Sequence, residues 1–191
     1  LSAYHEVFKA INKGFIHFAN STSARYAMLF DAVNSPEGDI ILHANRGVAG
    51  IDGCTSTAVG HALKTKEDVL LVSGDVAFLY DINGLASVQE LPDNIKVIVV
   101  NNGGGGIFRW LEGPNEVGLL ASHFETKPKT TIKAASHFCG LTYFCALDAE
   151  STQKKLTEFI QFPGPAVLEI VTDPKTSSEV YKKYIAAFQN K

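Results

Sequence analysis

The chain has 191 residues, a formal net charge of −3, and 46% hydrophobic against 19% charged residues. This length suits one domain with a single core, and the slight acidity argues against a nucleic-acid-binding domain, which usually carries a basic face. No apolar run approaches the roughly 18 residues of a membrane span. The first fifteen residues have the pattern of an amphipathic helix rather than of a signal peptide. Because the chain opens without methionine inside that apparent helix, we expect it to be a piece of a longer protein.

Cysteine and histidine give no sign of a metal centre. The three cysteines, Cys54, Cys139 and Cys145, are odd in number and lack metal-ligand spacing. We predict that they are reduced packing residues of a cytoplasmic protein. The six histidines show no spacing typical of a metal pair, so none is assigned to catalysis. His43 is expected to be a structural residue of a strand.

Segments rich in β-branched residues alternate with helical patterns along the chain. Strands are expected at 15–19, 39–45, 68–75, 94–102, 141–147 and 165–173. Helices are expected at 1–15, 21–33 (with Ser21 near the N-cap), 54–64, 81–91, 131–140, 151–162 and 176–190, with a short helical patch at 107–111. Residues 112–133 are polar and contain proline, which indicates a long surface loop.

This alternation predicts an α/β fold, a three-layer α/β/α sandwich around a mostly parallel sheet of about six strands. No linker or repeat divides the chain, so residues 1–191 are expected to form a single domain. In sheets of this kind, ligands bind beyond the carboxyl ends of the strands. The residues at the predicted strand exits are therefore the candidate site residues, namely 20–21, 45–46, 74–75 and 101–102.

Two neighbouring exits carry oxygen ligands. Gly74 lets the backbone turn, and Asp75 follows it directly, where a cation could sit. Asn102 ends the next strand along the chain and is followed by four glycines with open backbone groups. Mg²⁺ takes octahedral oxygen ligands and usually only one or two carboxylates, together with phosphate and water. The alternative is that Asp75 caps the next helix and Asn102 serves a turn.

The pairing of GD at 74–75 with NN at 101–102 resembles the signature of thiamine-diphosphate enzymes. Four stretches in order then resemble the C-terminal diphosphate-binding domain of one branch, the 2-succinyl-5-enolpyruvyl-6-hydroxy-3-cyclohexene-1-carboxylate (SEPHCHC) synthases of menaquinone biosynthesis. They are NSTSARY (20–26), NRGVAGIDGCTSTAVG (45–60), GDVAFLYDINGL (74–85) and VVNNGGGGIFRWL (99–111). Val76 departs from the glycine that most of the superfamily has there, and this branch tolerates an apolar residue at that position.

The resemblance implies roles for particular residues. Mg²⁺ (or Mn²⁺) would be held by Asp75, Asn102 and the carbonyl of Gly104. Ile51 would be the bulky residue that keeps the cofactor bent. The full set implied for thiamine diphosphate is Ile51, Gly74, Asp75, Val76, Ala77, Asn102, Gly104 and Ile107. The set implied for the substrates is Ser21, Arg25, Arg46, Ile107, Phe108 and Leu111.

Without the resemblance, several of these residues have plainer interpretations. Arginines are usually solvated at the surface, and Ile51 would be an ordinary core residue. The spacing of Ile107, Phe108 and Leu111 is more typical of a buried helix face than of a substrate wall.

The resemblance also implies a reaction and a missing part. A transferase of this kind decarboxylates 2-oxoglutarate and adds the resulting carbanion to isochorismate. The glutamate that activates the cofactor belongs to a pyrimidine-binding domain, for which this chain offers no candidate segment. We therefore expect that domain to come from a second subunit of a homodimer or homotetramer, and the isolated chain to be inactive.

Three alternatives stay open. Another thiamine-diphosphate enzyme, such as a decarboxylase or an acetolactate-synthase-like one, would act on pyruvate and would not need Arg25 and Arg46 for a dicarboxylate. A nucleotide-binding module would want G-x-G-x-x-G after the first strand or G-x-x-x-x-G-K-[ST], and the sequence has neither. An interaction-only protein would use the apolar segments as interface.

Overall fold

A computed structural model of the chain describes residues 2–11, 13–31, 39–47, 49–110, 113 and 118–189. Six strands form one sheet in the order β2-β1-β3-β4-β6-β5, and every neighbouring pair is parallel. The strands are β1 (Lys13–Phe18), β2 (Asp39–Ala44), β3 (Val69–Gly74), β4 (Ile95–Asn101), β5 (Thr142–Ala146) and β6 (Ala166–Val171). The predicted α/β class and the predicted parallel sheet of about six strands are confirmed.

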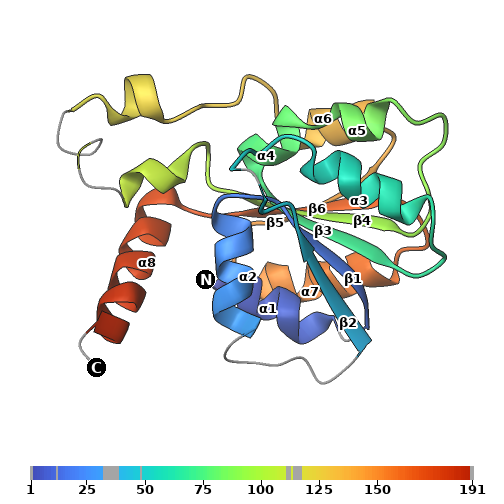
Figure 1. The fold of residues 1–191 in the computed structure, drawn as a ribbon, viewed down its shortest axis with the longest axis horizontal. Coiled ribbons are helices and arrows are strands. Elements are labelled where there is room, and N and C mark those ends of the chain that lie inside the picture. Colours follow the sequence, from blue (N-terminus) through green and yellow to red (C-terminus); the bar gives the residue numbers. More distant parts are fainter. Residues whose placement is uncertain are drawn as a thin grey trace.

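Helices cover both faces of the sheet, as Figure 1 shows. They are α1 (Ser2–Ala10), α2 (Thr22–Asp31), α3 (Cys54–Ala62), α4 (Asp75–Tyr80), α5 (Asn83–Ala86), α6 (Ile132–Phe138), α7 (Ala149–Gln161) and α8 (Pro174–Gln189), with a 3₁₀ turn η1 (Gly106–Arg109) and a π-helical turn η2 (Leu120–Phe124). Side chains alternate between the faces of each strand. Leu70 and Val72 therefore join a core with α1, α2 and α7, whereas Val69 and Leu71 join a core with α3 to α6.

Three predicted elements differ from the structure. The first helix ends at Ala10 and β1 begins at Lys13, because Gly14 has a φ of 96° that no helix accommodates. The helix expected at 81–91 starts instead at Asp75 and is split at Asp81, and the segment after Ala86 turns toward β4. The expected loop at 112–133 contains the π-helical turn at 120–124, and its last two residues belong to α6.

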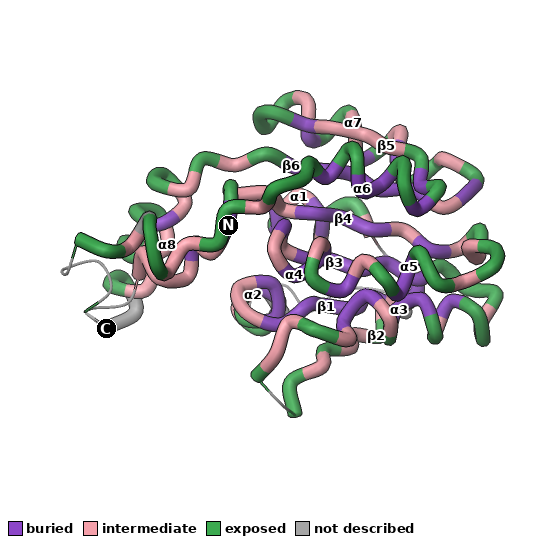
Figure 2. Tube along the Cα trace, turned by 90° about the horizontal axis from the view of Figure 1, so that it is seen from above, coloured by how far each residue is buried: buried purple, intermediate pink, exposed green. Residues whose placement is uncertain are grey.

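Helix α8 projects from the sheet and is largely exposed or half-buried (Figure 2). Its main anchor to the body is aromatic, since the Tyr181 ring stacks on Trp110 with centroids 4.1 Å apart. No helix within the described ranges is both long and apolar enough to cross a membrane. The three cysteines are free, with Cys54 and Cys139 buried and Cys145 half-buried, which agrees with the predicted packing role.

Candidate functional site

A cavity of about 370 Å³ opens at the carboxyl ends of β1, β3 and β4. This is the edge at which parallel α/β sheets bind ligands, and the volume is typical of small-molecule sites. Nine of the residues to which the resemblance gives a role line it: Ser21, Ile51, Gly74, Asp75, Val76, Ala77, Asn102, Ile107 and Phe108. The fold therefore gathers side chains from all but one of the predicted strand exits in one place.

Asp75 supplies the acidic group of this cavity. Strand β3 is buried over its length, and Gly74 keeps an extended backbone (φ −83°, ψ 162°) that leads into Asp75, the first residue of α4. The carboxylate is buried, and its Oδ2 atom has no hydrogen-bond partner among the described residues. Burial raises the pKa of the Asp75 carboxyl, and the backbone N–H groups of Val76, Gly104 and Gly103 oppose that rise. An ionised Asp75 thus has a free, desolvated acceptor oxygen, which suits a cation.

Asn101, rather than Asn102, holds the turn after β4. Its Oδ1 accepts from the Gly103 N–H at 2.9 Å, and its Nδ2 donates to Glu169 Oε1 at 2.6 Å. Glu169 is buried on β6 and also accepts a hydrogen bond from the Tyr143 hydroxyl at 2.5 Å. The turn role that the sequence left open for Asn102 therefore belongs to its neighbour.

Asn102 faces the cavity beside the glycine run. A Cβ on Gly106 would lie 2.6 Å from Asn102 Nδ2, so only glycine leaves room for this amide. Gly104 has a φ of 113°, is buried, and lies against the Thr126 carbonyl, where a Cβ would overlap. Gly104 is not in the cavity lining, although Thr126 is. The glycine run thus lets the segment around Thr126 close over the turn that carries Asn102.

Ser21 lines the cavity in a strained conformation. It is the one described residue other than glycine with a positive φ, at 72°, and α2 begins at the next residue. Ser21 thus lies at the start of α2, as expected, but its left-handed backbone differs from the extended one that an N-cap residue normally has. A left-handed serine is uncommon, and such residues cluster at functional sites.

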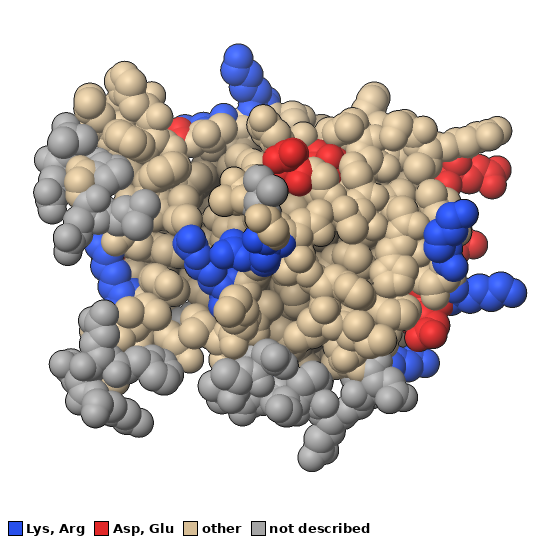
Figure 3. All heavy atoms as spheres, in the orientation of Figure 1, with Lys and Arg blue, Asp and Glu red and all other residues tan. Residues whose placement is uncertain are grey.

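The arginines singled out in the sequence lie elsewhere. Arg25 on α2 and Arg46 after β2 are both exposed and are absent from the lining of this cavity. Figure 3 shows basic side chains gathered on the face between α2 and α8. Leu111, expected beside Ile107 and Phe108, lies outside the described residues.

An aromatic wall that the sequence did not reveal closes one side of the cavity. It is made by Tyr4, Tyr26 and Trp110, and the Tyr4 ring meets Tyr26 edge-on with centroids 4.8 Å apart. The Tyr4 hydroxyl donates to Ser23 Oγ at 2.8 Å, which fixes α1 against α2. Trp110, at the end of the IFRW stretch, is the one member of this wall that the sequence could have indicated. Nothing in the sequence places Tyr4 beside Trp110.

The model of one protein family matches most of this chain. The C-terminal TPP-binding domain of thiamine pyrophosphate enzymes matches residues 25–170. The chain belongs to this family. The match spans α2 to β6 and so includes both exits that carry Asp75 and Asn102. Thiamine diphosphate, the same compound as thiamine pyrophosphate, is therefore the cofactor that this domain is built to bind.

Curated proteins that are similar over most of this chain include several SEPHCHC synthases. The chain is 37% identical to that of Christiangramia forsetii over 186 residues, which is 96% of this chain and 31% of the relative. It is 38% identical to that of Flavobacterium psychrophilum (88% of this chain, 30% of the relative) and 40% identical to that of Desulfotalea psychrophila (83% and 28%). The chain thus spans less than a third of the length of these relatives.

Proposed function

We propose that this chain is the cofactor-binding domain of a SEPHCHC synthase, a transferase of menaquinone biosynthesis in the cytoplasm. The observation that supports it most is the buried Asp75 carboxylate with a free Oδ2, placed at the ligand-binding edge of a thiamine-diphosphate domain. The similarity to SEPHCHC synthases over most of the chain narrows the choice within that family. The nucleotide-binding and interaction-only alternatives have no comparable support.

In this proposal, Asp75, the Asn102 amide oxygen and the Gly104 carbonyl would hold the Mg²⁺ or Mn²⁺ that accompanies the diphosphate. One carboxylate and two neutral oxygens are a set that Mg²⁺ accepts, with phosphate and water completing the octahedron. The partnerless Asp75 oxygen fits this role, because a buried anion needs a partner. Gly74, Val76 and Ala77 would border the diphosphate, since all three line the cavity at the start of α4.

The remaining residues shape the reaction space. When bound, thiamine diphosphate would supply the thiazolium carbon that makes decarboxylation of a 2-oxoacid possible. Ile51, which packs on a small core with Ala19, Cys54 and Ala77, would support the bent cofactor from below. Ile107 and Phe108 would keep water from the reacting carbon, which favours loss of a charged carboxylate as CO₂.

The substrates we propose are 2-oxoglutarate and isochorismate, with Ser21 in contact with them. Arg25 and Arg46 keep a proposed role as carboxylate ligands, but their place outside the described cavity means that this role rests on sequence resemblance alone. The proposal makes residues 1–191 one domain whose site is completed by a pyrimidine-binding domain of a second subunit, in a homodimer or homotetramer.

The substrate prediction is tested on the natural polypeptide that contains this sequence. With thiamine diphosphate and Mg²⁺ it should release CO₂ from 2-oxoglutarate and form a carbon–carbon bond to isochorismate, and pyruvate should be a poor donor. Product is measured by mass spectrometry. A preference for pyruvate would assign the chain to a decarboxylase or an acetolactate-synthase-like enzyme instead. The 191-residue chain alone should give no turnover, and robust turnover by it would disprove the shared site.

Replacing Gly104 with alanine should weaken cofactor binding. The new Cβ would overlap the Thr126 carbonyl, and the positive φ adds strain. We expect an affinity loss of about 10- to 100-fold, which corresponds to roughly 1–3 kcal/mol of strain. Gly140→Ala is the matched control, because Gly140 also has a positive φ (76°) but has open space around its Cβ position. Calorimetric titration with thiamine diphosphate and Mg²⁺ measures both variants, and equal losses would exclude the Thr126 contact as the cause.

A further inference from the structure

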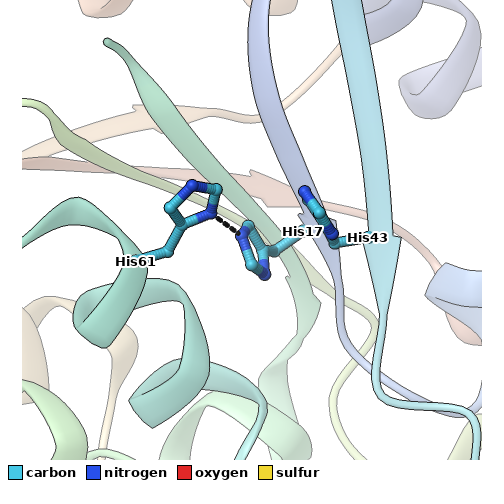
Figure 4. A group of neighbouring side chains, drawn as sticks. All are labelled: His17, His43 and His61. Carbon is cyan, nitrogen blue, oxygen red and sulfur yellow. Dashed lines mark hydrogen bonds between the residues drawn. The ribbon is translucent and has the colours of Figure 1, made fainter. Parts of the chain in front are cut away.

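Three histidines that are far apart in the sequence meet on one face of the sheet. His17 on β1 and His43 on β2 are direct register partners, and His61 reaches them from α3 (Figure 4). One ring nitrogen of each lies within 4.8 Å of the others. His17 Nε2 and His61 Nδ1 share a hydrogen bond of 2.8 Å, and the His17 and His43 rings stack with centroids 4.8 Å apart. The spacing of the histidines along the chain gave no sign of this cluster, because the cluster depends on strand order and register.

The cluster is partly shielded from solvent, and one of its ring nitrogens lacks a hydrogen-bond partner. His17 is buried, and His43 and His61 are half-buried. The His43 Nε2 atom is buried and has no hydrogen-bond partner among the described residues, an unusual state for a polar group. Phe15 adds an apolar wall, with its ring centroid 4.3 Å from that of His61. These groups have no part in the cofactor cavity, because none of them lines it.

The His17 imidazole is in the protonation state that a metal requires. Burial lowers the pKa of His17 to about 4, and His43 and His61 add to the effect. The His17 imidazole is therefore neutral near pH 7. In its hydrogen bond to His61, one nitrogen donates and the other accepts, so a single proton lies between two nitrogens that each have ligand capacity.

We propose that His17, His43 and His61 form a binding site for a divalent transition metal such as Zn²⁺, separate from the magnesium site proposed at Asp75. Imidazole nitrogen is a preferred ligand of Zn²⁺, Cu²⁺ and Ni²⁺, whereas Mg²⁺ prefers oxygen. Three protein ligands with a fourth position left to water form a known type of tetrahedral zinc site. The metal takes the place of the proton between His17 and His61, and that proton moves to the other nitrogen of its own ring, so that both imidazoles stay neutral. The third ligand is a ring nitrogen of His43.

The adjustment needed is small. Tetrahedral ligands about 2.0–2.1 Å from zinc are about 3.3 Å apart, so the 2.8 Å contact between His17 and His61 must open by about half an ångström. His43 must approach by more, and it lies on β2, the edge strand of the sheet. His43 and His61 are also the half-buried members, so an ion can enter from their side.

The test is zinc binding by the 191-residue chain, without thiamine diphosphate and with excess Mg²⁺ to occupy oxygen sites. Metal analysis after dialysis should give one Zn²⁺ per chain, and Co²⁺ in its place should give the intense visible absorption of a tetrahedral nitrogen site. His43→Gln and His61→Gln should each weaken zinc binding on the order of a hundredfold, since each removes one of three ligands. Both residues are half-buried, so these variants are better suited than a His17 variant to retain the fold, which circular dichroism checks.

His137→Gln is the matched control, because His137 is exposed on α6 and outside the cluster. It should bind zinc like the parent chain. The proposal is overturned if the folded chain takes up no stoichiometric zinc, or if His43→Gln and His61→Gln bind it as tightly as His137→Gln. It is also overturned if the bound Co²⁺ gives only the weak absorption of an octahedral ion. None of these outcomes depends on the proposed synthase function.

Discussion

Asp75→Asn should remove the magnesium-dependent binding of thiamine diphosphate while leaving the fold intact. The substitution keeps the shape of the side chain and removes its negative charge. A divalent cation at this position needs that charge. We expect the apparent affinity for the cofactor in Mg²⁺ to fall on the order of 100-fold or more, equivalent to about 3 kcal/mol. Calorimetric titration with thiamine diphosphate, with and without Mg²⁺, measures the loss.

The same substitution should not lower stability. Asp75 is buried with an unpartnered oxygen, and burial raises its pKa, so the metal-free chain pays to hold the charge there. Without metal, the Asn variant should therefore have a free energy of unfolding equal to or above that of the parent. Mg²⁺ with cofactor should raise the melting temperature of the parent and not that of the variant.

Asp93→Asn is the control for charge alone. Asp93 is exposed in the turn before β4, at the opposite end of the sheet from the cavity. The Asp93→Asn variant should bind thiamine diphosphate as tightly as the parent chain does. If Asp75→Asn still binds thiamine diphosphate in a magnesium-dependent manner, Asp75 is not a metal ligand and the site must be reassigned.

The strand exits could be predicted from the sequence because they depend on local pattern. Apolar runs of about six residues that break at a glycine or asparagine mark where parallel strands end, and such ends meet at one edge. Gly74–Asp75 and Asn101–Asn102 were located in this way, and β3 and β4 are neighbours with Gly74 opposite Val100. Which asparagine makes the turn depends on Glu169, a residue 68 positions away, so that detail needed the fold.

The histidine cluster and the aromatic wall could not be predicted without the strand order, which the periodicity of the sequence does not encode. His17 and His61 are 44 residues apart, and His43 reaches them only because β2 adds to the outer side of β1 in register. Trp110 packs on Tyr26 and Tyr181, which lie in helices at opposite ends of the chain. The helix predicted at 81–91 differs from the structure because a contact of Asp81 with a residue distant in the sequence competes with local helix propensity.

Replacing Asp81 with alanine should destabilise the chain by about 2–4 kcal/mol. Asp81 is buried at the end of α4, where Oδ2 accepts from the Ser56 N–H at 2.8 Å and Oδ1 accepts from the Ser56 hydroxyl at 2.9 Å. Helix α3 has no side-chain cap of its own, since its N-cap is Gly53 with a φ of 73°. Asp81 therefore caps α3 from another helix, and its charge also interacts favourably with the positive end of the α3 dipole.

Urea unfolding followed by circular dichroism measures the change. Asp81→Asn should cost only about 1–2 kcal/mol, because one amide oxygen can still accept a hydrogen bond but the charge is lost. Asp68→Ala is the control, since Asp68 is exposed before β3 and should change stability by less than about 0.5 kcal/mol. Equal stability of all three variants would mean that Ser56 finds another partner. If the ranking holds, a carboxylate at this position anchors α3 and the loop before it that carries Ile51, so this part of the cofactor cavity is positioned by an acid that never touches the ligand.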